Sequence, residues 1–131
     1  MIIITRNQFY ELVYSPAKNR IYFTIRGYWR NPEQVPDFFA DWQKALQQTQ
    51  PGFTVLADLQ EMITHPVAVK EMHFKVASSL LAAGISYIAE VSPIDKIAVL
   101  QTSSIIKENQ LNHIKVHDKT LGETILDQLT L

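Results

Sequence analysis

Cysteine is absent from the 131-residue sequence. Its absence excludes disulfides, thiolate metal ligands and cysteine nucleophiles, and it agrees with a cytoplasmic location. An excess of positive charge is also missing, because twelve Lys and Arg residues stand against thirteen Asp and Glu, giving a formal net charge of -1. No long-range positive field therefore draws the chain to the phosphates of nucleic acid or to anionic lipids. We expect neither nucleic acid nor a membrane as a partner.

Long apolar runs and glycine clusters are missing as well. The N-terminal run Ile2-Ile3-Ile4 is too short for a signal peptide or a bilayer span. The chain holds only four glycines, and they form neither a Gly-x-Gly-x-x-Gly motif nor a P-loop. A chain of this length with 47% apolar residues can build one core without a metal or disulfide. We expect a single domain over residues 1–131.

β-Branched and aromatic residues predict an N-terminal hairpin, with strands over residues 9–14 and 20–26 joined by a turn. Three aromatic residues in and after the second strand, Tyr22, Tyr28 and Trp29, are difficult to bury together. Because aromatic side chains are enriched at interface cores, the hairpin is a candidate interaction surface. Ordinary partial exposure of these rings is the alternative.

Capping signals predict four helices after the hairpin. Asn31 with Pro32 marks the start of the first helix, Thr64 that of the second, Ser92 that of the third and Thr120 that of the fourth. The first helical stripe is expected to place Val35, Phe38, Phe39, Trp42 and Leu46 in the core. Residues 96–101 alone would also fit a strand, and the signal at Ser92 favours a helix.

Strands are expected between these helices, over residues 53–58, 85–91 and 113–117. The resulting order, β-β-α-β-α-β-α-β-α, predicts an α/β fold with right-handed βαβ crossovers. Its sheet should be mixed and mostly parallel, with an antiparallel N-terminal edge hairpin and about four helices. The strand at 85–91 should lie parallel beside that at 53–58.

This order, with Asp58-Leu59 ending the third expected strand and a helix about six residues later, resembles the STAS domain family, typified by bacterial anti-sigma-factor antagonists. The segment Leu80-Leu-Ala-Ala-Gly-Ile-Ser-Tyr-Ile-Ala-Glu-Val-Ser-Pro93 is similar to small stand-alone STAS-like bacterial proteins. The resemblance implies a non-catalytic regulatory or protein-binding module. It also implies an architectural or partner-facing role for Asp58 at the strand end.

Antagonists of this family carry Asp-Ser-Ser-Gly in the turn before the second helix, and a partner kinase phosphorylates its serine. This sequence has Thr64-His65-Pro66-Val67 there instead. The departure implies that the serine switch is absent. Thr64 is expected to cap the helix, its hydroxyl oxygen accepting a backbone N–H.

The second helix carries two apolar stripes. The stripe expected to face the core consists of Val69, Met72, Val76, Leu80 and Ala83. A second stripe, Val67, Phe74 and Leu81, lies on another side of the helix. It either packs on a neighbouring helix or forms an exposed ridge for a protein partner or a second copy of the chain. With surplus apolar positions of this kind, a homodimer is one expected arrangement.

The four histidines do not predict a metal site. His113 and His117 are four residues apart in an expected strand, which separates them by about 13 Å. His65 and His73 are eight residues apart, more than two turns of a helix. No zinc signature or Gly-x-Ser-x-Gly elbow is present. We therefore expect no metal, no cofactor and no catalytic residue.

An alternative function is that of a carrier or sensor for a small apolar or nucleotide ligand. Open α/β sheets bind ligands at the carboxyl ends of their strands. A sizeable cleft beside Asp58, Thr64 and Ser92 would favour this alternative, and a dry core with an apolar outer patch would favour the protein-binding module. The candidate binding residues of the two functions are Asp58, Gln60, Thr64, His65, Val67, Phe74, Leu81 and Ser92.

Overall fold

The computed structural model describes residues 1–130, and Leu131, the last residue of the expected domain, lies outside them. Six strands form one sheet in the order β1-β2-β3-β4-β5-β6. The strands are β1 (Ile2–Arg6), β2 (Tyr10–Ser15), β3 (Arg20–Gly27), β4 (Thr54–Met62), β5 (Tyr87–Val91) and β6 (His113–Val116). The helices are α1 (Phe38–Gln48), α2 (Val67–Ala82), α3 (Lys96–Glu108) and α4 (Lys119–Leu129), and a short 3₁₀ turn, η1, covers Pro32–Gln34.

The expected α/β class is confirmed, with one additional strand. The hairpin β2–β3 is antiparallel, and β3, β4, β5 and β6 pair in parallel. The parallel pairing of β5 with β4 is as predicted. The apolar N-terminal run, which the sequence did not mark as a strand, forms β1 and pairs antiparallel with β2. It is therefore β1, and not the strand at residues 9–14, that forms the edge of the sheet.

Strand β4 extends further than the expected segment 53–58. The pairing register with β3 shifts between Thr24 and Arg26, which pair with Asp58 and Glu61, so β4 carries one extra residue there. The Asp58 carboxylate accepts hydrogen bonds from the backbone and side-chain amides of Gln60 across this bulge. The polar residues of this bulge, Asp58 and Gln60, explain why the sequence predicted that the strand ends at residue 58. In the structure the pairing with β3 continues to Met62.

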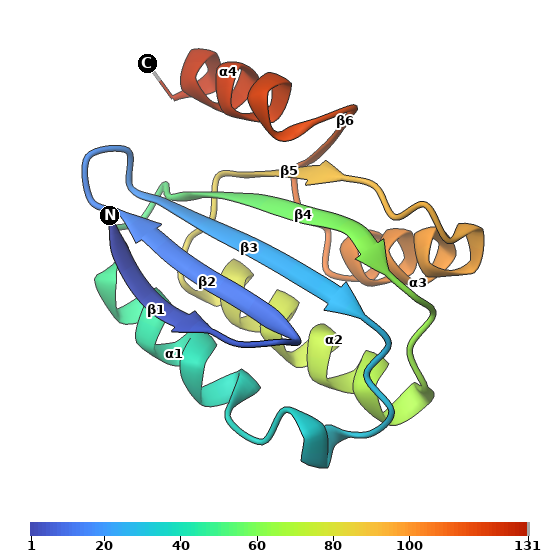
Figure 1. Ribbon diagram of the computed structural model, residues 1–131. Helices are drawn as coiled ribbons and strands as arrows, with labels where there is room; N and C mark the ends of the chain where they lie inside the picture. Colours follow the sequence, from blue (N-terminus) through green and yellow to red (C-terminus); the bar gives the residue numbers. More distant parts are fainter. Residues whose placement is uncertain (131) are drawn as a thin grey trace.

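The helices lie on both faces of the sheet. Helices α1, α2 and α3 cover one face, and α4 alone covers part of the other (Figure 1). The larger core lies under the three helices. Helix α4 is attached by Arg20 of β3, which is fully buried and whose Nη1 donates to Glu123 and Asp127 of α4 at 2.8 and 2.9 Å.

The predicted starts of the helices are partly wrong. Asn31 is a cap, its side chain accepting from the amide of Gln34, but it caps only the short turn η1, and α1 begins later, at Phe38. Residues 96–101 are helical, as the sequence favoured, but the cap of α3 is Asp95 and not Ser92. Asp118 caps α4 in place of Thr120. Asp95, three residues after Ser92, and Asp118, two residues before Thr120, take the capping positions because each lies in extended backbone directly before the first helical residue.

Thr64 does not cap α2, and that prediction is also wrong. The helix begins after Pro66, which supplies no side-chain cap, and the hydroxyl of Thr64 donates to Asp95 at 3.0 Å. Two aromatic positions differ as well. Trp29 is fully buried, and its indole N–H donates to the carbonyls of Phe9 and Arg26. Phe39 of the expected core stripe is instead 44% exposed.

Candidate functional site

Helices α2 and α3 lie side by side and are joined at both ends by polar contacts. Near the start of α2, the Asp95 carboxylate accepts from the backbone and the hydroxyl of Thr64. The side chain of Gln101 accepts from the amide of His65 and donates to its carbonyl. Further along, the hydroxyl of Ser78 donates to the side chain of Asn109 at 2.9 Å. These contacts fix the start of α2 to the flank of α3.

Apolar side chains are exposed along this pair of helices. Val67, Phe74 and Leu81 recur every seven residues, so they share one side of α2, and all three are exposed. Ser78 belongs to the same side, four residues after Phe74, and it contacts α3. The second stripe therefore borders α3 and remains open to solvent, which is the exposed-ridge alternative.

Helix α3 and the two preceding loops extend this ridge. Gln101 of α3 accepts a hydrogen bond from the backbone amide of His65. Ile97 lies one helical turn before Gln101, and Leu100 directly precedes Gln101 in the sequence. Ile63 and Ile94 flank the residues of the Thr64–Asp95 contact. The α2–α3 apolar surface is defined here as the exposed residues Ile63, Val67, Phe74, Leu81, Ile94, Ile97 and Leu100. Ile97 and Leu100 were not predicted as surface residues, although the helical period of α3 places them on the side away from the buried Ala98, Thr102 and Ile105.

His65 does not belong to the exposed surface. It is only 3% exposed, and its ring stacks on Trp29 with a centroid separation of 4.9 Å. Its Nδ1 lies 3.1 Å from Nε2 of His73, and its Nε2 lies 3.3 Å from the carbonyl of Gly27. The eight-residue spacing, more than two helical turns, predicted that the two imidazoles lie far apart, and that prediction is wrong. His65 precedes Pro66 and lies outside α2, so its ring can stack on that of His73.

Burial keeps this histidine pair uncharged. It lowers the pKa of His65 to about 4, against a small opposing effect of the Gly27 carbonyl. Burial likewise lowers the pKa of His73 to about 3, and repulsion from His65 adds to that shift. Two stacked neutral imidazoles beside Trp29 stabilise the loop before α2. Within residues 1–130, no group of three or more histidine or carboxylate side chains is placed to hold a metal ion.

The polar candidates do not form one cleft. Asp58 faces the α4 side of the sheet, where its carboxylate lies 3.7 Å from the Nζ of Lys119. Thr64 is held by Asp95, and Ser92 donates to the buried Glu90 at 3.3 Å. The sheet therefore separates Asp58 from the start of α2.

An open hollow of about 400 Å³ lies at the carboxyl ends of the strands. Its walls come from β4, β5, β6 and the loops that follow them, and they comprise Gln60, Val91, Ser92, Ile94, Lys115, Val116 and His117. Two of the candidate residues, Gln60 and Ser92, thus lie together in the position that open α/β sheets use for ligands.

No protein-family model, curated protein or solved structure matches this chain. Among residues 1–130, no helix combines the length and the apolar character that crossing a membrane requires.

Proposed function

We propose that this protein is a cytoplasmic, non-catalytic protein-binding module of the STAS-like type, which docks through the α2–α3 apolar surface. The observation that carries the proposal is the exposure of large aliphatic side chains on two helices fixed to each other, with Val67 at 73% and Leu100 at 70%. Apolar patches of this kind are typical of protein interaction sites. The parallel pairing of β4 with β5 is the arrangement that the STAS resemblance requires.

The partner that fits this surface is a second copy of the chain. A two-fold interface places the same patch on both sides, so the patch must be complementary to itself. Both helices of this surface carry both signs of charge, with Lys70 and Glu71 on α2 and Lys107 and Glu108 on α3. The net charge of -1 adds little long-range repulsion between two copies.

Regulation by serine phosphorylation is not part of the proposal. The segment Thr64-His65-Pro66-Val67 offers one hydroxyl, and that hydroxyl donates to Asp95 at 3.0 Å. A phosphate on Thr64 would bring two negative groups together at the junction of α2 and α3. Stoichiometric phosphate on Thr64 in protein from its source would contradict this view.

Sedimentation of the full chain tests the proposal. The wild-type protein should form dimers at high micromolar concentration, and Leu100→Asp should be monomeric with unchanged thermal stability, because an exposed leucine leaves no cavity. Leu129→Asp is the matched control, since Leu129 is an exposed leucine on α4 at the opposite face of the sheet. A wild-type monomer, or a dimer that survives Leu100→Asp, would overturn the self-association through this surface.

The hollow beside Gln60 and Ser92 favours a second candidate function, the binding of a small apolar or nucleotide ligand. Lys115 and His117 in its wall would suit a phosphate. Titration with a nucleoside monophosphate, followed by the amide signals of Ser92 and His117, decides this case. Saturable shifts there, lost in Lys115→Gln, would support nucleotide binding, and unchanged signals would exclude a nucleotide as the ligand of this hollow.

A further inference from the structure

Within residues 1–130, α4 is the one helix on the outer face of the sheet, the face opposite α1, α2 and α3 (Figure 1). The core beneath it is small. It consists of the buried residues Leu56, Ala89 and Leu126, with Tyr22 and Tyr87 partly buried against them. Leu126 is the only large buried side chain that α4 itself contributes. The burial of so little apolar surface contributes little to the free energy that holds α4 in place.

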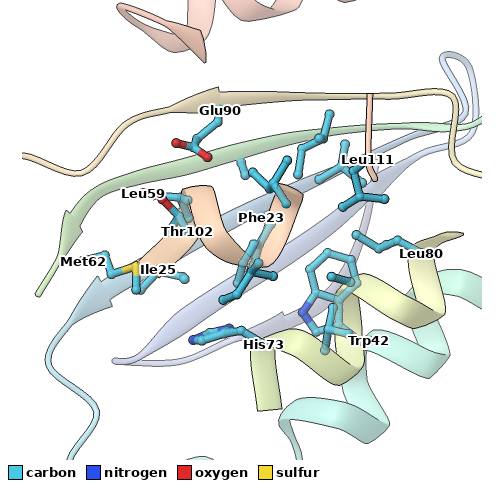
Figure 2. A pocket seen from close by; sticks show the side chains of 17 residues that line it. Phe23, Ile25, Trp42, Leu59, Met62, His73, Leu80, Glu90, Thr102 and Leu111 are labelled. Atoms are coloured by element: carbon cyan, nitrogen blue, oxygen red, sulfur yellow. The ribbon is translucent and has the colours of Figure 1, made fainter. Parts of the chain in front are cut away.

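The inner face of the sheet, under α1, α2 and α3, carries the larger core. This core includes a cavity of about 80 Å³, and Figure 2 shows Phe23 of β3, Trp42 of α1 and Leu80 of α2 around it. The buried carboxylate of Glu90 lines the same cavity from β5. Because the inner and outer cores share only the strands between them, the packing of α1, α2 and α3 does not depend on α4.

Polar side chains make most of the contacts between α4 and the sheet. The acceptors on α4 are the carboxylates of Glu123 and Asp127. The donors belong to β3 and the turn before it, and they are Lys18, Arg20 and Tyr22. The side chains of Lys18, Glu123 and Asp127 are 40%, 27% and 45% exposed, so water reaches these contacts. Separation of α4 from the sheet hydrates every one of these charges, including that of Arg20, and leaves none of them buried without a partner.

The connection of α4 to the rest of the chain is short and exposed. Only His117 and Asp118 lie between the end of β6 at Val116 and the start of α4, and both are exposed. Near this connection, Nζ of Lys119 lies 3.7 Å from the carboxylate of Asp58. Within residues 1–130, no backbone hydrogen bond joins α4 to a strand. Segments with few buried apolar contacts open locally at a lower free-energy cost than the core.

We propose that α4 is a releasable cover, which leaves the outer face as a unit by rotation about His117 and Asp118 while the sheet and α1, α2 and α3 stay folded. Release exposes Tyr22 and Leu56, which also line an open hollow of about 410 Å³ on the same face. The area under α4 and this hollow then form one larger surface. This surface lies on the opposite side of the sheet from the α2–α3 apolar surface, so the proposal is independent of the protein-binding function.

Native-state hydrogen exchange of the full chain tests the proposal. The amides of α4, such as those of Ile125 and Leu126, should have protection factors at least tenfold lower than the most protected amides of β3 and β4. Their exchange should also depend less on urea concentration, because the release of one helix exposes less surface than global unfolding. Amides of α4 that are as protected as those of β4, with the same dependence on urea, would overturn the proposal.

Two variants distinguish the release of α4 from unfolding of the whole chain. Ile25→Val weakens the inner core, which stays folded when α4 leaves, so it should speed exchange in β4 about two- to tenfold and leave exchange in α4 unchanged. Glu123→Gln weakens the contacts that hold α4 and should speed exchange in α4 about tenfold or more. The matched control is Glu71→Gln, at an exposed glutamate of α2, which should leave exchange in α4 unchanged.

The proposal is contradicted if Ile25→Val speeds exchange in α4 as much as in β4, because α4 then opens only with the whole chain. It is also contradicted if exchange in α4 is the same in Glu123→Gln as in the wild-type protein. Neither result depends on whether the chain dimerises.

Discussion

Nδ1 of His65 accepts a hydrogen bond from Nε2 of His73, the two atoms lying 3.1 Å apart in rings that stack at 5.2 Å. The direction follows from Nε2 of His65, which lies 3.3 Å from the carbonyl of Gly27 and must carry the hydrogen there. Each ring thus holds a single proton, on Nε2. A second proton on His65 would remove the acceptor and place a charge beside Trp29.

Stability should therefore fall at mildly acidic pH. In the unfolded chain both histidines take up protons below about pH 6.5, whereas burial lowers the folded pKa values of His65 and His73 to about 4 and about 3. Between about pH 6.5 and the folded pKa of each histidine, the unfolded state binds more protons than the folded state. The free energy of unfolding therefore decreases as the pH falls through this range, by about 1.4 kcal/mol per pH unit for each histidine. Carboxylates whose pKa is lowered, such as Glu123, add to the loss only below about pH 5.

Urea unfolding at several pH values between neutrality and pH 5 measures this slope. His73→Leu should reduce it by about half, since one of the two groups no longer titrates. His117→Gln is the control, because His117 is exposed and outside the pair. An unchanged slope in His73→Leu would show that the pair is not the source of the acid sensitivity.

This histidine pair could not be predicted from the sequence, for a physical reason. Spacing along a helix separates residues 65 and 73, but Pro66 lies before the first turn and allows the chain to reverse direction. The partner of a loop residue is decided by tertiary packing, here by stacking on Trp29. The contact between Asp95 and Thr64 could not be predicted either, because the two residues are 31 positions apart and no local sequence pattern links them.

Glycine at position 122 should be required for the close approach of α4 to the sheet. A Cβ at Gly122 would lie 2.6 Å from Cδ1 of Leu56 and 3.2 Å from Cγ2 of Val116. Gly122→Ala should destabilise the protein by about 1–3 kcal/mol through overpacking, although alanine usually favours a helix. Thermal unfolding beside Thr124→Ala, an exposed change on the same helix, measures the effect, and a stabilised Gly122→Ala would contradict the packing.

Arg20 should be the side chain that secures α4 to β3. Its Nε donates to Thr54 and its Nη1 to Glu123 and Asp127, and it is fully buried. Arg20→Ala should cost about 3 kcal/mol, because both a packed stem and a network of charge-assisted hydrogen bonds are lost. Arg26→Ala, at a more exposed arginine of the same strand, is the control. Equal losses in the two variants would show that Arg20 has no special role.

Phe74 should matter little for stability. It is 37% exposed on the α2–α3 apolar surface, so Phe74→Ala should change the free energy of unfolding by much less than the 3–5 kcal/mol typical of a core phenylalanine. Phe38→Ala, at a fully buried phenylalanine of α1, provides the comparison in the same urea series. If Phe74→Ala lowers the free energy of unfolding as much as Phe38→Ala does, the side chain of Phe74 is packed in the core and cannot belong to a docking surface.

Much of the fold followed from periodicity, because alternating strands and amphipathic helices determine the layers before any detail of packing. The strand β1 escaped prediction since Ile2, Ile3 and Ile4 are three consecutive apolar residues without alternation, at an edge where one bulge interrupts the pairing. Among the site residues, Val67, Phe74 and Leu81 could be identified from the sequence. A helix that packs on an open sheet needs only one apolar stripe, so a second apolar stripe indicates another role. Glu90 was not among the predicted site residues: it is the one charged residue of β5, and only the packing of the helices shows that it lines a cavity.

A dilution series of amide NMR spectra of the wild-type chain tests whether two copies of this protein meet through the α2–α3 apolar surface. Signals of Val67, Phe74, Ile97 and Leu100 should shift together as the concentration rises, while those of β1 and α4 remain constant. Spectra that do not change with concentration, or shifts that gather on β1 or α4, would contradict this interface.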